Sequence, residues 1–378
     1  MPDPLQIARD LVPLVEREAT HSEQLATMPD PVVAAFRESR LFALQVPAEL
    51  GGFEADFATA LSVYETICRA DASTGWSLLA NASTSAFAST FTGDDAVAAM
   101  FGGGKLPTHA GQFSPRGTSV ATDRGYLVSG SYSFGSGSAH AEWIGGGTLE
   151  LVEGVPRMVT PERPAIRAFF VPRDCVEFTG NWDVMGLVGT GSFDYTVPEQ
   201  LVGAGFTFDI VGDRPQRGGP MYRIGVLGLA AVGHAGFALG VGRRALDEIA
   251  VLAQTKQRLG QVSPLVEQER FQYELGHHDA ALRAARALVF DVFGDAQVRL
   301  EAGDELGLAE LVPVRQATTY ATDMAAEVAR FAYLASGTDG LRNPNVIGRC
   351  FRDIHAATQH MVVDPSTIAQ SGRALLGR

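Results

Sequence analysis

The chain has 378 residues, of which 46% are hydrophobic, and this is enough apolar material to bury one or two sizeable cores. Its formal net charge of -13 argues against a nucleic acid or an anionic membrane as partner. The 3 cysteines are odd in number and none forms a CxxC pair, so the sequence predicts neither a disulfide framework nor a metal site. Since the N-terminus lacks a basic segment followed by an apolar run, we expect a soluble cytoplasmic protein.

Residues 1 to 105 are predicted to form an N-terminal helical domain. Apolar side chains share one helical face in the first helix, at Ile7, Leu11, Leu14 and Val15. Asp71 and Ser73 are candidate N-caps for a later helix that contains Trp76. Gly102 to Pro107 should end this segment.

Residues 106 to 215 are predicted to form a central β-domain. Alternation places Tyr126, Val128, Tyr132 and Phe134 on one face of a strand, which follows a hairpin turn at 122–125. A further run, Ile166 to Val171, is apolar except for Arg167 and is typical of a buried strand. Several short strands between Gly, Pro and Asp turns favour a small barrel or sandwich.

The stretch from Gly130 to Trp143, GSYSFGSGSAHAEW, changes character halfway. Its strand runs into Gly135–Ser138, where small residues let another molecule approach the backbone closely. His140 and Trp143 then add a titratable ring and a flat aromatic ring. The pattern is typical of a pocket wall for a flat polar ligand, although a glycine-rich surface turn with an incidental histidine has the same composition.

Residues 216 to 378 are predicted to form a C-terminal four-helix bundle. Two of its apolar stripes at helical spacing are Leu246, Ile249, Ala250 and Ala253, and Leu282, Ala285, Val289 and Phe293. The last helical stretch is interrupted by polar residues, at Arg352, Asp353, His355 and His360.

This order of helical domain, β-domain and helical bundle resembles the acyl-CoA dehydrogenase superfamily, and four motifs carry the resemblance. They are VPAELGG (46–52), ADASTGWSL (70–78), WDVMGLVGTGS (182–192) and FRDIHAATQH (351–360). The resemblance covers nearly the whole chain. It implies an α+β chain with the acyl-CoA dehydrogenase-like fold.

Within that superfamily, the motifs are more similar to two-component flavin monooxygenases than to dehydrogenases. A dehydrogenase needs a carboxylate past the Arg-Asp pair to remove the substrate's α-proton, and 359–364 holds no Glu. The GSYSFGSGSAHAEW stretch resembles the signature of oxygenase components that use reduced flavin from a separate reductase. The resemblance implies hydroxylation of an aromatic, phenolic small molecule through a C4a-hydroperoxyflavin, with FMNH2 or FADH2 and O2, in a homotetramer.

The resemblance also implies roles for individual residues. His360 and Ser136 would be catalytic, and His109 and Trp76 would bind substrate. The flavin would be held by a larger set, namely Ser136, Trp143, Trp182, Thr190, Ser192 and Arg258. His355 is the weaker alternative to His360. Val188 stands where relatives commonly carry Arg, and Tyr132 where they commonly carry Trp.

Three other interpretations stay open at this level. The chain could be an acyl-CoA dehydrogenase-like flavoprotein that holds FAD tightly. It could be an N-hydroxylating monooxygenase that acts on an amino sugar or amine. It could also be a family member that has lost catalysis and only binds a ligand or partner.

Overall fold

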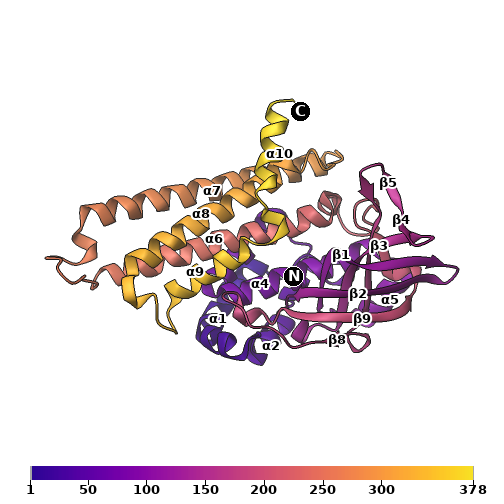
Figure 1. The fold of residues 1–378 in the computed structure, drawn as a ribbon, viewed down its shortest axis with the longest axis horizontal. Helices are drawn as coiled ribbons and strands as arrows, with labels where there is room; N and C mark the ends of the chain where they lie inside the picture. Colours follow the sequence, from indigo (N-terminus) through magenta and orange to yellow (C-terminus); the bar gives the residue numbers. More distant parts are fainter. Residues whose placement is uncertain (1, 378) are drawn as a thin grey trace.

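The computed structural model describes residues 2–377, and its first third is helical (Figure 1). Asp71 caps the fourth helix by accepting a hydrogen bond from the backbone N–H of Thr74, as the sequence predicts. The helices are α1 (Pro4–Leu25), α2 (Asp30–Glu38), α3 (Phe57–Ala70), α4 (Ala72–Phe91) and α5 (Asp94–Phe101).

The central segment forms one eight-stranded sheet in the order β10-β7-β3-β1-β2-β9-β8, with β4 paired to β3. Its pairs are antiparallel except β1 and β3, which run parallel. The strands are β1 (His109–Thr122), β2 (Gly125–Gly135), β3 (Trp143–Val152), β4 (Val155–Pro156), β7 (Ile166–Pro172), β8 (Glu177–Phe178), β9 (Phe193–Val202) and β10 (Thr207–Asp209). A separate pair, β5 (Met158–Thr160) and β6 (Arg163–Pro164), extends from the edge of the domain.

The predicted hairpin is present, with Thr122 paired to Gly125, but one residue of β2 departs from the predicted face. Tyr132 is buried, whereas Phe134 is 64% exposed and has a φ of 66°. The pairing of β2 with β9 also shifts between Tyr132 and Gly135. A left-handed residue with a register shift breaks the period of two, so the alternation wrongly placed Phe134 with Tyr132.

The last segment is a helical bundle built around α6, which packs against α7, α8 and α9. Among the described residues, one helical stretch, 220–253, is long and apolar enough to cross a bilayer, but 83% of its most apolar window is buried within the protein. This stretch is therefore the core of the bundle. The helices are α6 (Gly225–Ala253), α7 (Glu269–Glu301), α8 (Val312–Ser336), α9 (Val346–Ala357) and α10 (Ser366–Leu375).

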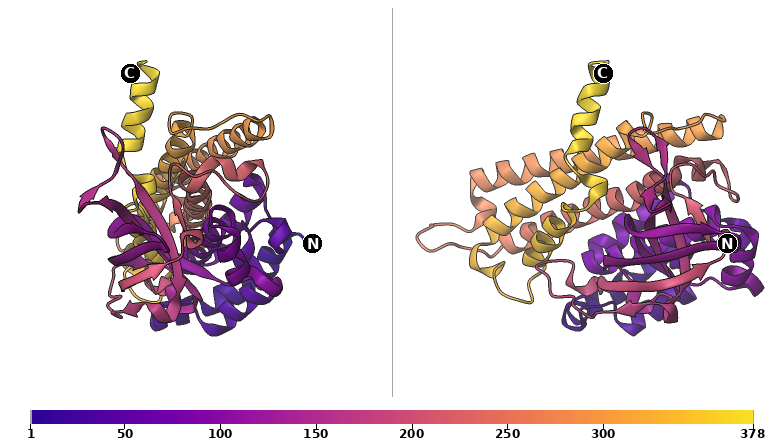
Figure 2. Two further views of the ribbon diagram at one scale, coloured as in Figure 1. Left: turned by 90° about the vertical axis from the view of Figure 1, so that its right-hand side faces the viewer. Right: turned by 45° about the vertical axis from the view of Figure 1, so that its right-hand side comes forward.

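Helix α4 is the element that joins the three parts, because it packs against both α6 and β1. All its residues except Ala80 are buried. Figure 2 shows the sheet on one side of the N-terminal helices and the bundle on another. Side chains that point from α4 toward the sheet and toward the bundle therefore lie where the domains meet.

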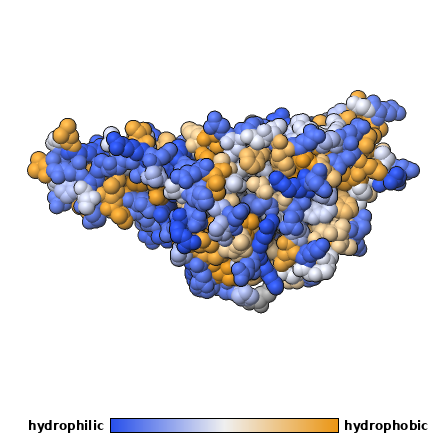
Figure 3. Space-filling view, turned by 90° about the horizontal axis from the view of Figure 1, so that it is seen from below, coloured by the Kyte–Doolittle hydropathy of each residue, from blue (hydrophilic) through white to orange (hydrophobic). Residues whose placement is uncertain are grey.

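The predicted domain limits, near residues 105 and 215, fall between α5 and β1 and between β10 and α6. As domain boundaries they stay predictions. The surface seen from below carries apolar patches among polar residues (Figure 3). On the bundle and its C-terminal helix, the exposed large apolar side chains include Tyr273, Leu288, Val298, Leu334, Leu375 and Leu376.

Candidate functional site

Trp76, in the second turn of α4, is the centre of a group of polar and aromatic side chains drawn from all three parts of the fold. Its indole Nε1 donates a hydrogen bond to Ser136 Oγ at 3.0 Å. Its ring meets His234 edge-on at 4.9 Å between centroids and His360 at 5.7 Å. We call Trp76, Ser136, Ser192, His234 and His360 the Trp76 cluster.

The hydroxyl groups of the cluster form a chain whose direction can be derived. Ser136 Oγ and Thr190 Oγ1 each lie 2.7 Å from Ser192 Oγ, and Thr190 donates its proton to the carbonyl of Leu187. A hydroxyl has one proton, so Ser192 must donate to Thr190 and Ser136 must donate to Ser192. Because Trp76 donates to Ser136, the proton of Ser136 is used within the protein. Its remaining capacity is one acceptor lone pair.

The loop that presents Ser136 is held from below by Asn81 of α4. Asn81 Nδ2 donates to the carbonyls of His109 and Gly137, while its Oδ1 lies 2.8 Å from His140 Nε2. Gly137 has a φ of 69°, and a Cβ there would lie 2.4 Å from Asn81 Oδ1. Glycine is therefore required where the loop crosses α4.

His360 lies just past the end of α9, where it begins a short 3-10 turn rather than continuing the helix. Its Nδ1 accepts a hydrogen bond from the backbone N–H of Val362. Burial lowers the pKa of His360 to about 4, so the ring is neutral near pH 7. A neutral ring with an accepting Nδ1 carries its proton on Nε2, and this N–H is a fixed donor.

His234, on α6, belongs to the cluster but is absent from the residues that the sequence singled out. Its ring centroid lies 4.1 Å from that of His360. Burial, and then repulsion from His360, lowers its pKa well below the usual value. The available signal was its isolation: from Gly225 to Gly242 it is the one residue with a polar side chain.

Two charged residues of α9, Arg349 and Asp353, support the cluster without entering it. Asp353 accepts a hydrogen bond from the backbone N–H of Leu187, which ties α9 to the loop that carries Thr190 and Ser192. Arg349 lies 3.5 Å from Asp71, the N-cap of α4. Burial raises the pKa of Asp353 to about 7. Arg349 therefore positions the start of α4, and Asp353 positions the loop that carries Thr190 and Ser192.

Two aromatic side chains of the β-domain, one exposed and one half-buried, lie beside the loops that carry Ser136 and Thr190. The exposed Phe134 meets the half-buried Trp182 edge-on at 6.2 Å between centroids. Trp182 Nε1 donates to the carbonyl of Val188, so the indole is fixed to the same loop as Thr190. Met361, beside His360, is also exposed, and its sulfur accepts a hydrogen bond from Ser114. These apolar surfaces suit a flat ligand.

The structure places His109 away from the cluster, in the interior of the chain. Its Nδ1 lies 3.1 Å from Ser85 Oγ, its Nε2 lies 3.4 Å from the sulfur of Met100, and its ring stacks on Phe101. Both ring nitrogens have protein partners. Ser85 is nine residues along α4 from Trp76, about 13 Å by helix rise.

The other predicted residues also have partners outside the cluster. Trp143 stacks on Phe206 at 5.8 Å. Arg258 donates to the carbonyls of Leu334 and Ala335, at the end of α8. His355 bonds the carbonyl one turn before it and packs on Phe351, which is the helix-packing role predicted for it. Whether Trp143 or Arg258 reaches a flavin stays a prediction.

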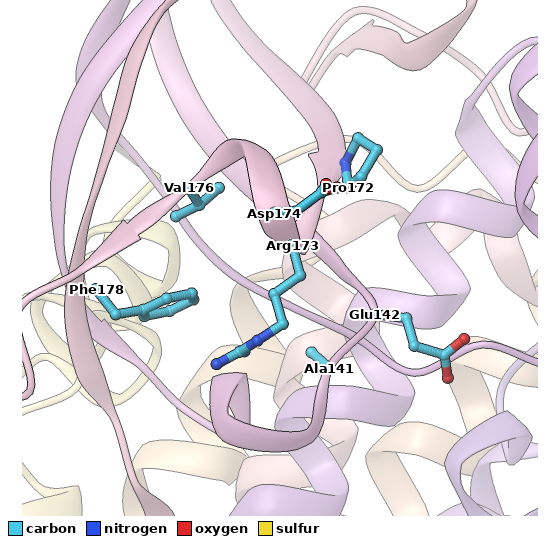
Figure 4. A pocket seen from close by; sticks show the side chains of 7 residues that line it. All are labelled: Ala141, Glu142, Pro172, Arg173, Asp174, Val176 and Phe178. Carbon is cyan, nitrogen blue, oxygen red and sulfur yellow. The ribbon is translucent and has the colours of Figure 1, made fainter.

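A separate open hollow lies on the β-domain, lined by Ala141, Glu142, Pro172, Arg173, Asp174, Val176 and Phe178. Arg173 lies over the ring of Phe178 and donates to the carbonyl of Ser138 (Figure 4). None of its lining residues belongs to the Trp76 cluster. Its arginine stabilises the loop behind Ser136, so the hollow has a structural explanation.

Family models match two parts of the chain. The acyl-CoA dehydrogenase N-terminal domain matches residues 7–99, and the acyl-CoA dehydrogenase C-terminal domain matches residues 232–365. Both matched ranges contribute to the cluster, Trp76 from the first and the two histidines from the second.

Individual proteins match over nearly the whole chain. An indole-3-acetate monooxygenase of Pseudomonas putida is 28% identical, over 92% of this chain and 87% of its own length. A protein named flavin-dependent monooxygenase, oxygenase subunit HsaA, of Rhodococcus jostii is 24% identical, over 94% and 93%. The solved structure of XiaF from Streptomyces sp., in complex with FADH2 and glycerol, superposes with a TM-score of 0.89 at 21% identity, over 99% and 95%.

Proposed function

We propose, given that this chain belongs to the acyl-CoA dehydrogenase superfamily and is a flavin-dependent monooxygenase within it, that it hydroxylates an aromatic, phenolic small molecule. It would act as the oxygenase component of a two-component system, with reduced flavin delivered by a separate reductase. O2 is the co-substrate. An anaerobic titration distinguishes FMN from FAD as the flavin.

The observation that carries this proposal is the direction of the hydroxyl chain. Ser136 donates its hydroxyl proton to Ser192, so its oxygen can only accept a hydrogen bond from a ligand. The flavin N5 carries a proton in the reduced form and none in the oxidised form. Ser136 therefore suits the reduced form, and a buried acceptor facing an acceptor is costly. The same seryl oxygen would hold the N5 proton in place.

His360 complements Ser136 with a donor. Its Nε2–H is fixed by the bond from Val362 to Nδ1, and the neutral ring adds no charge to the site. When bound, the reduced flavin would supply the electrons that activate O2, and O2 is the source of the transferred oxygen atom. The chain's part is to orient the flavin with these fixed polar atoms and to exclude water with the rings of Trp76 and Phe237.

The dehydrogenase alternative lacks its base. Within residues 2–377, no carboxylate contacts the Trp76 cluster in hydrogen bonds or ion pairs. The nearest acidic residue in sequence after His360 is Asp364, which is exposed and accepts from the backbone of Ser366. Removal of an α-proton requires a carboxylate within reach of the substrate, and this site provides two neutral histidines instead.

Three features of the proposal rest on the relatives and the surface. The Rhodococcus jostii relative is named as an oxygenase subunit, which supports a separate reductase as partner here. Exposed apolar side chains on the outer bundle helices support self-association, which we propose gives a homotetramer. The buried position of the most apolar helical stretch supports a soluble cytoplasmic enzyme.

Anaerobic titration tests this function. The protein is titrated with reduced and oxidised FMN and FAD, and then mixed with oxygen and a panel of phenols while product and hydrogen peroxide are measured. We expect much tighter binding of one reduced flavin, followed by hydroxylated product. Equal affinity for both redox states, together with reduction of bound flavin by an acyl-CoA, would overturn the proposal.

A further inference from the structure

His234 is a buried polar residue at an apolar position of the fold. It lies in the first half of α6, within the stretch Gly225–Gly242, whose other residues are Gly, Ala, Val, Leu and Phe. Only 4% of its surface is exposed. A phenylalanine or leucine would suit this helix better, because burying an imidazole without partners costs stability. The reason for a histidine at this position must therefore lie in what the ring contacts outside the helix.

The ring nitrogens of His234 have no hydrogen-bond partner among residues 2–377, although the ring is buried. This separates it from His109, His140 and His360, each of which has at least one ring nitrogen bonded within the protein. Nor do the nitrogens of His234 belong to the polar atoms that are both unpartnered and sealed from solvent. Each of them therefore keeps a small solvent-accessible surface, on a ring that neighbours Trp76 and His360.

The neighbouring rings define what the nitrogens of His234 can bind. The His234 ring lies 4.9 Å from Trp76 and 4.1 Å from His360, so it shares a wall with the residues that we assign to the flavin. The titratable group that faces it is His360, which is neutral, and like charges on two rings this close would repel. His234 is thus a neutral imidazole with one donor and one acceptor.

We propose that His234 is the substrate-recognition residue, and that its unpaired ring nitrogen accepts a hydrogen bond from the N–H or O–H of a neutral aromatic ring. This inference rests on the proposed function and narrows its substrate class. An anionic phenolate or a ring without a donor could accept a hydrogen bond from the N–H of His234, but it would leave the other, accepting ring nitrogen unsatisfied. His234 then takes the role that the sequence assigned to His109.

Binding of matched probes tests the inference. We compare indole with 1-methylindole, and phenol with anisole, by anaerobic equilibrium binding to the protein saturated with reduced flavin. Wild type should prefer the member of a pair that carries the donor by about tenfold, the worth of one hydrogen bond. The indole pair and the phenol pair distinguish an N–H from an O–H substrate.

Two variants identify His234 as the source of the preference. His234→Phe keeps a flat ring of similar size and should bring the ratio within each pair close to one, while His234→Gln should keep most of it. Affinity for reduced flavin and the circular dichroism spectrum show that each variant is folded. If His234→Phe does not fold, His234→Met takes its place.

The two proposals fail in different ways. A wild type that does not bind reduced flavin contradicts the proposed function. A wild type that binds reduced flavin but does not discriminate within either pair contradicts only the role of His234. That role is contradicted in the same way if His234→Phe discriminates as strongly as wild type.

Discussion

Four histidines of this chain are held neutral by the surrounding protein, and they form two contrasting pairs in each of which one ring is buried and the other half-buried. His109 and His140 lie around Asn81, where Ser85, Met100 and Asn81 itself bond three of their four ring nitrogens, and His140 Nδ1 is sealed from solvent without a partner among the described residues. His234 and His360 stack on each other beside Trp76, and within the described part of the chain only one of their four nitrogens has a partner. Among residues 2–377, the first pair thus has one unpartnered nitrogen, which is sealed from solvent, whereas the second has three, and none of these is sealed.

The contrast teaches how to separate a structural from a functional histidine. In the Asn81 region the rings complete a network that holds the glycine-rich loop on α4. In the Trp76 cluster the protein fixes the orientation of the rings and leaves their polar atoms free. Such unsatisfied atoms lower the stability of the empty protein, and the hydrogen bonds of a bound ligand offset this cost.

The largest expected effect is a loss of stability in acid, because the histidines of both pairs have lowered pKa values. Burial lowers the pKa of His109 and His140 to about 3 and of His360 to about 4, below the usual 6.5. The unfolded chain therefore takes up more protons below pH 6.5, and stability falls as the pH drops from 6.5 toward these values. As the pH falls from 6.5 to about 4, each of these rings lowers the free energy of unfolding by roughly 3 kcal/mol. The typical total for a protein is about 5–15 kcal/mol.

We therefore expect the protein to unfold before pH 4. Asp353, Asp71 and Asp323 have the opposite sign, because their pKa values are raised and each takes up its proton at a higher pH in the folded state, but we expect the four histidines to outweigh them. Urea unfolding at pH 7.5, 5.5 and 4.5 measures the trend, with the exposed His21→Asn as a control that should follow wild type. A flat stability across this range would refute the buried neutral state.

Removal of His360 should have the next largest effect and should separate the pairs. His360→Ala deletes the fixed Nε2–H donor, so we expect retained binding of reduced flavin but a fall in product per flavin of roughly hundredfold, with hydrogen peroxide released instead. His355→Ala, in the same segment but packed on Phe351, is the matched control and should couple nearly as wild type. Normal coupling in His360→Ala, with loss in His355→Ala, would exchange their roles.

Loss of the Ser136 hydroxyl should reduce turnover by about tenfold, because one fixed hydrogen bond and the orientation it gives are lost. Ser136→Ala also leaves Trp76 Nε1 without its acceptor. Preference for reduced over oxidised flavin should weaken in the same variant. Ser133→Ala is the control, since Ser133 is exposed on β2. Equal damage from both changes would mean that the pocket lies on another face.

The smallest effect on chemistry is expected at His109. His109→Phe removes the bonds to Ser85 and Met100 but can keep the stacking on Phe101, so we expect a loss of roughly 1–3 kcal/mol in stability. Product per flavin should stay within about twofold of wild type, since the ring nitrogens already have protein partners. A coupling defect in a variant of normal stability would restore the substrate role that the sequence predicted.

Local signals in the sequence predicted much of this molecule. The N-cap at Asp71, the hairpin at 122–125 and the buried strand at 166–171 each depend on a few neighbouring residues, and each is present. The motif resemblance also identified Ser136, Ser192 and His360, which the structure brings together around Trp76.

The features that local patterns did not reveal share a tertiary cause. Phe134 left its predicted face because a left-handed residue and a shift in pairing with β9 interrupt the alternation. The interior position of His109 depends on packing against Phe101 and Met100 of another segment, which no spacing in its own strand reveals. His234 was overlooked because one polar residue in an apolar helix is ordinarily a core histidine.

A structure of the protein with reduced flavin, prepared without oxygen, tests the central claim most directly. We predict that Ser136 Oγ and His360 Nε2 lie within hydrogen-bond distance of the flavin ring, and that His109 and His140 keep their present partners. A flavin bound at the hollow beside Arg173, or one that contacts His109 while the Trp76 cluster stays free of it, would contradict the account.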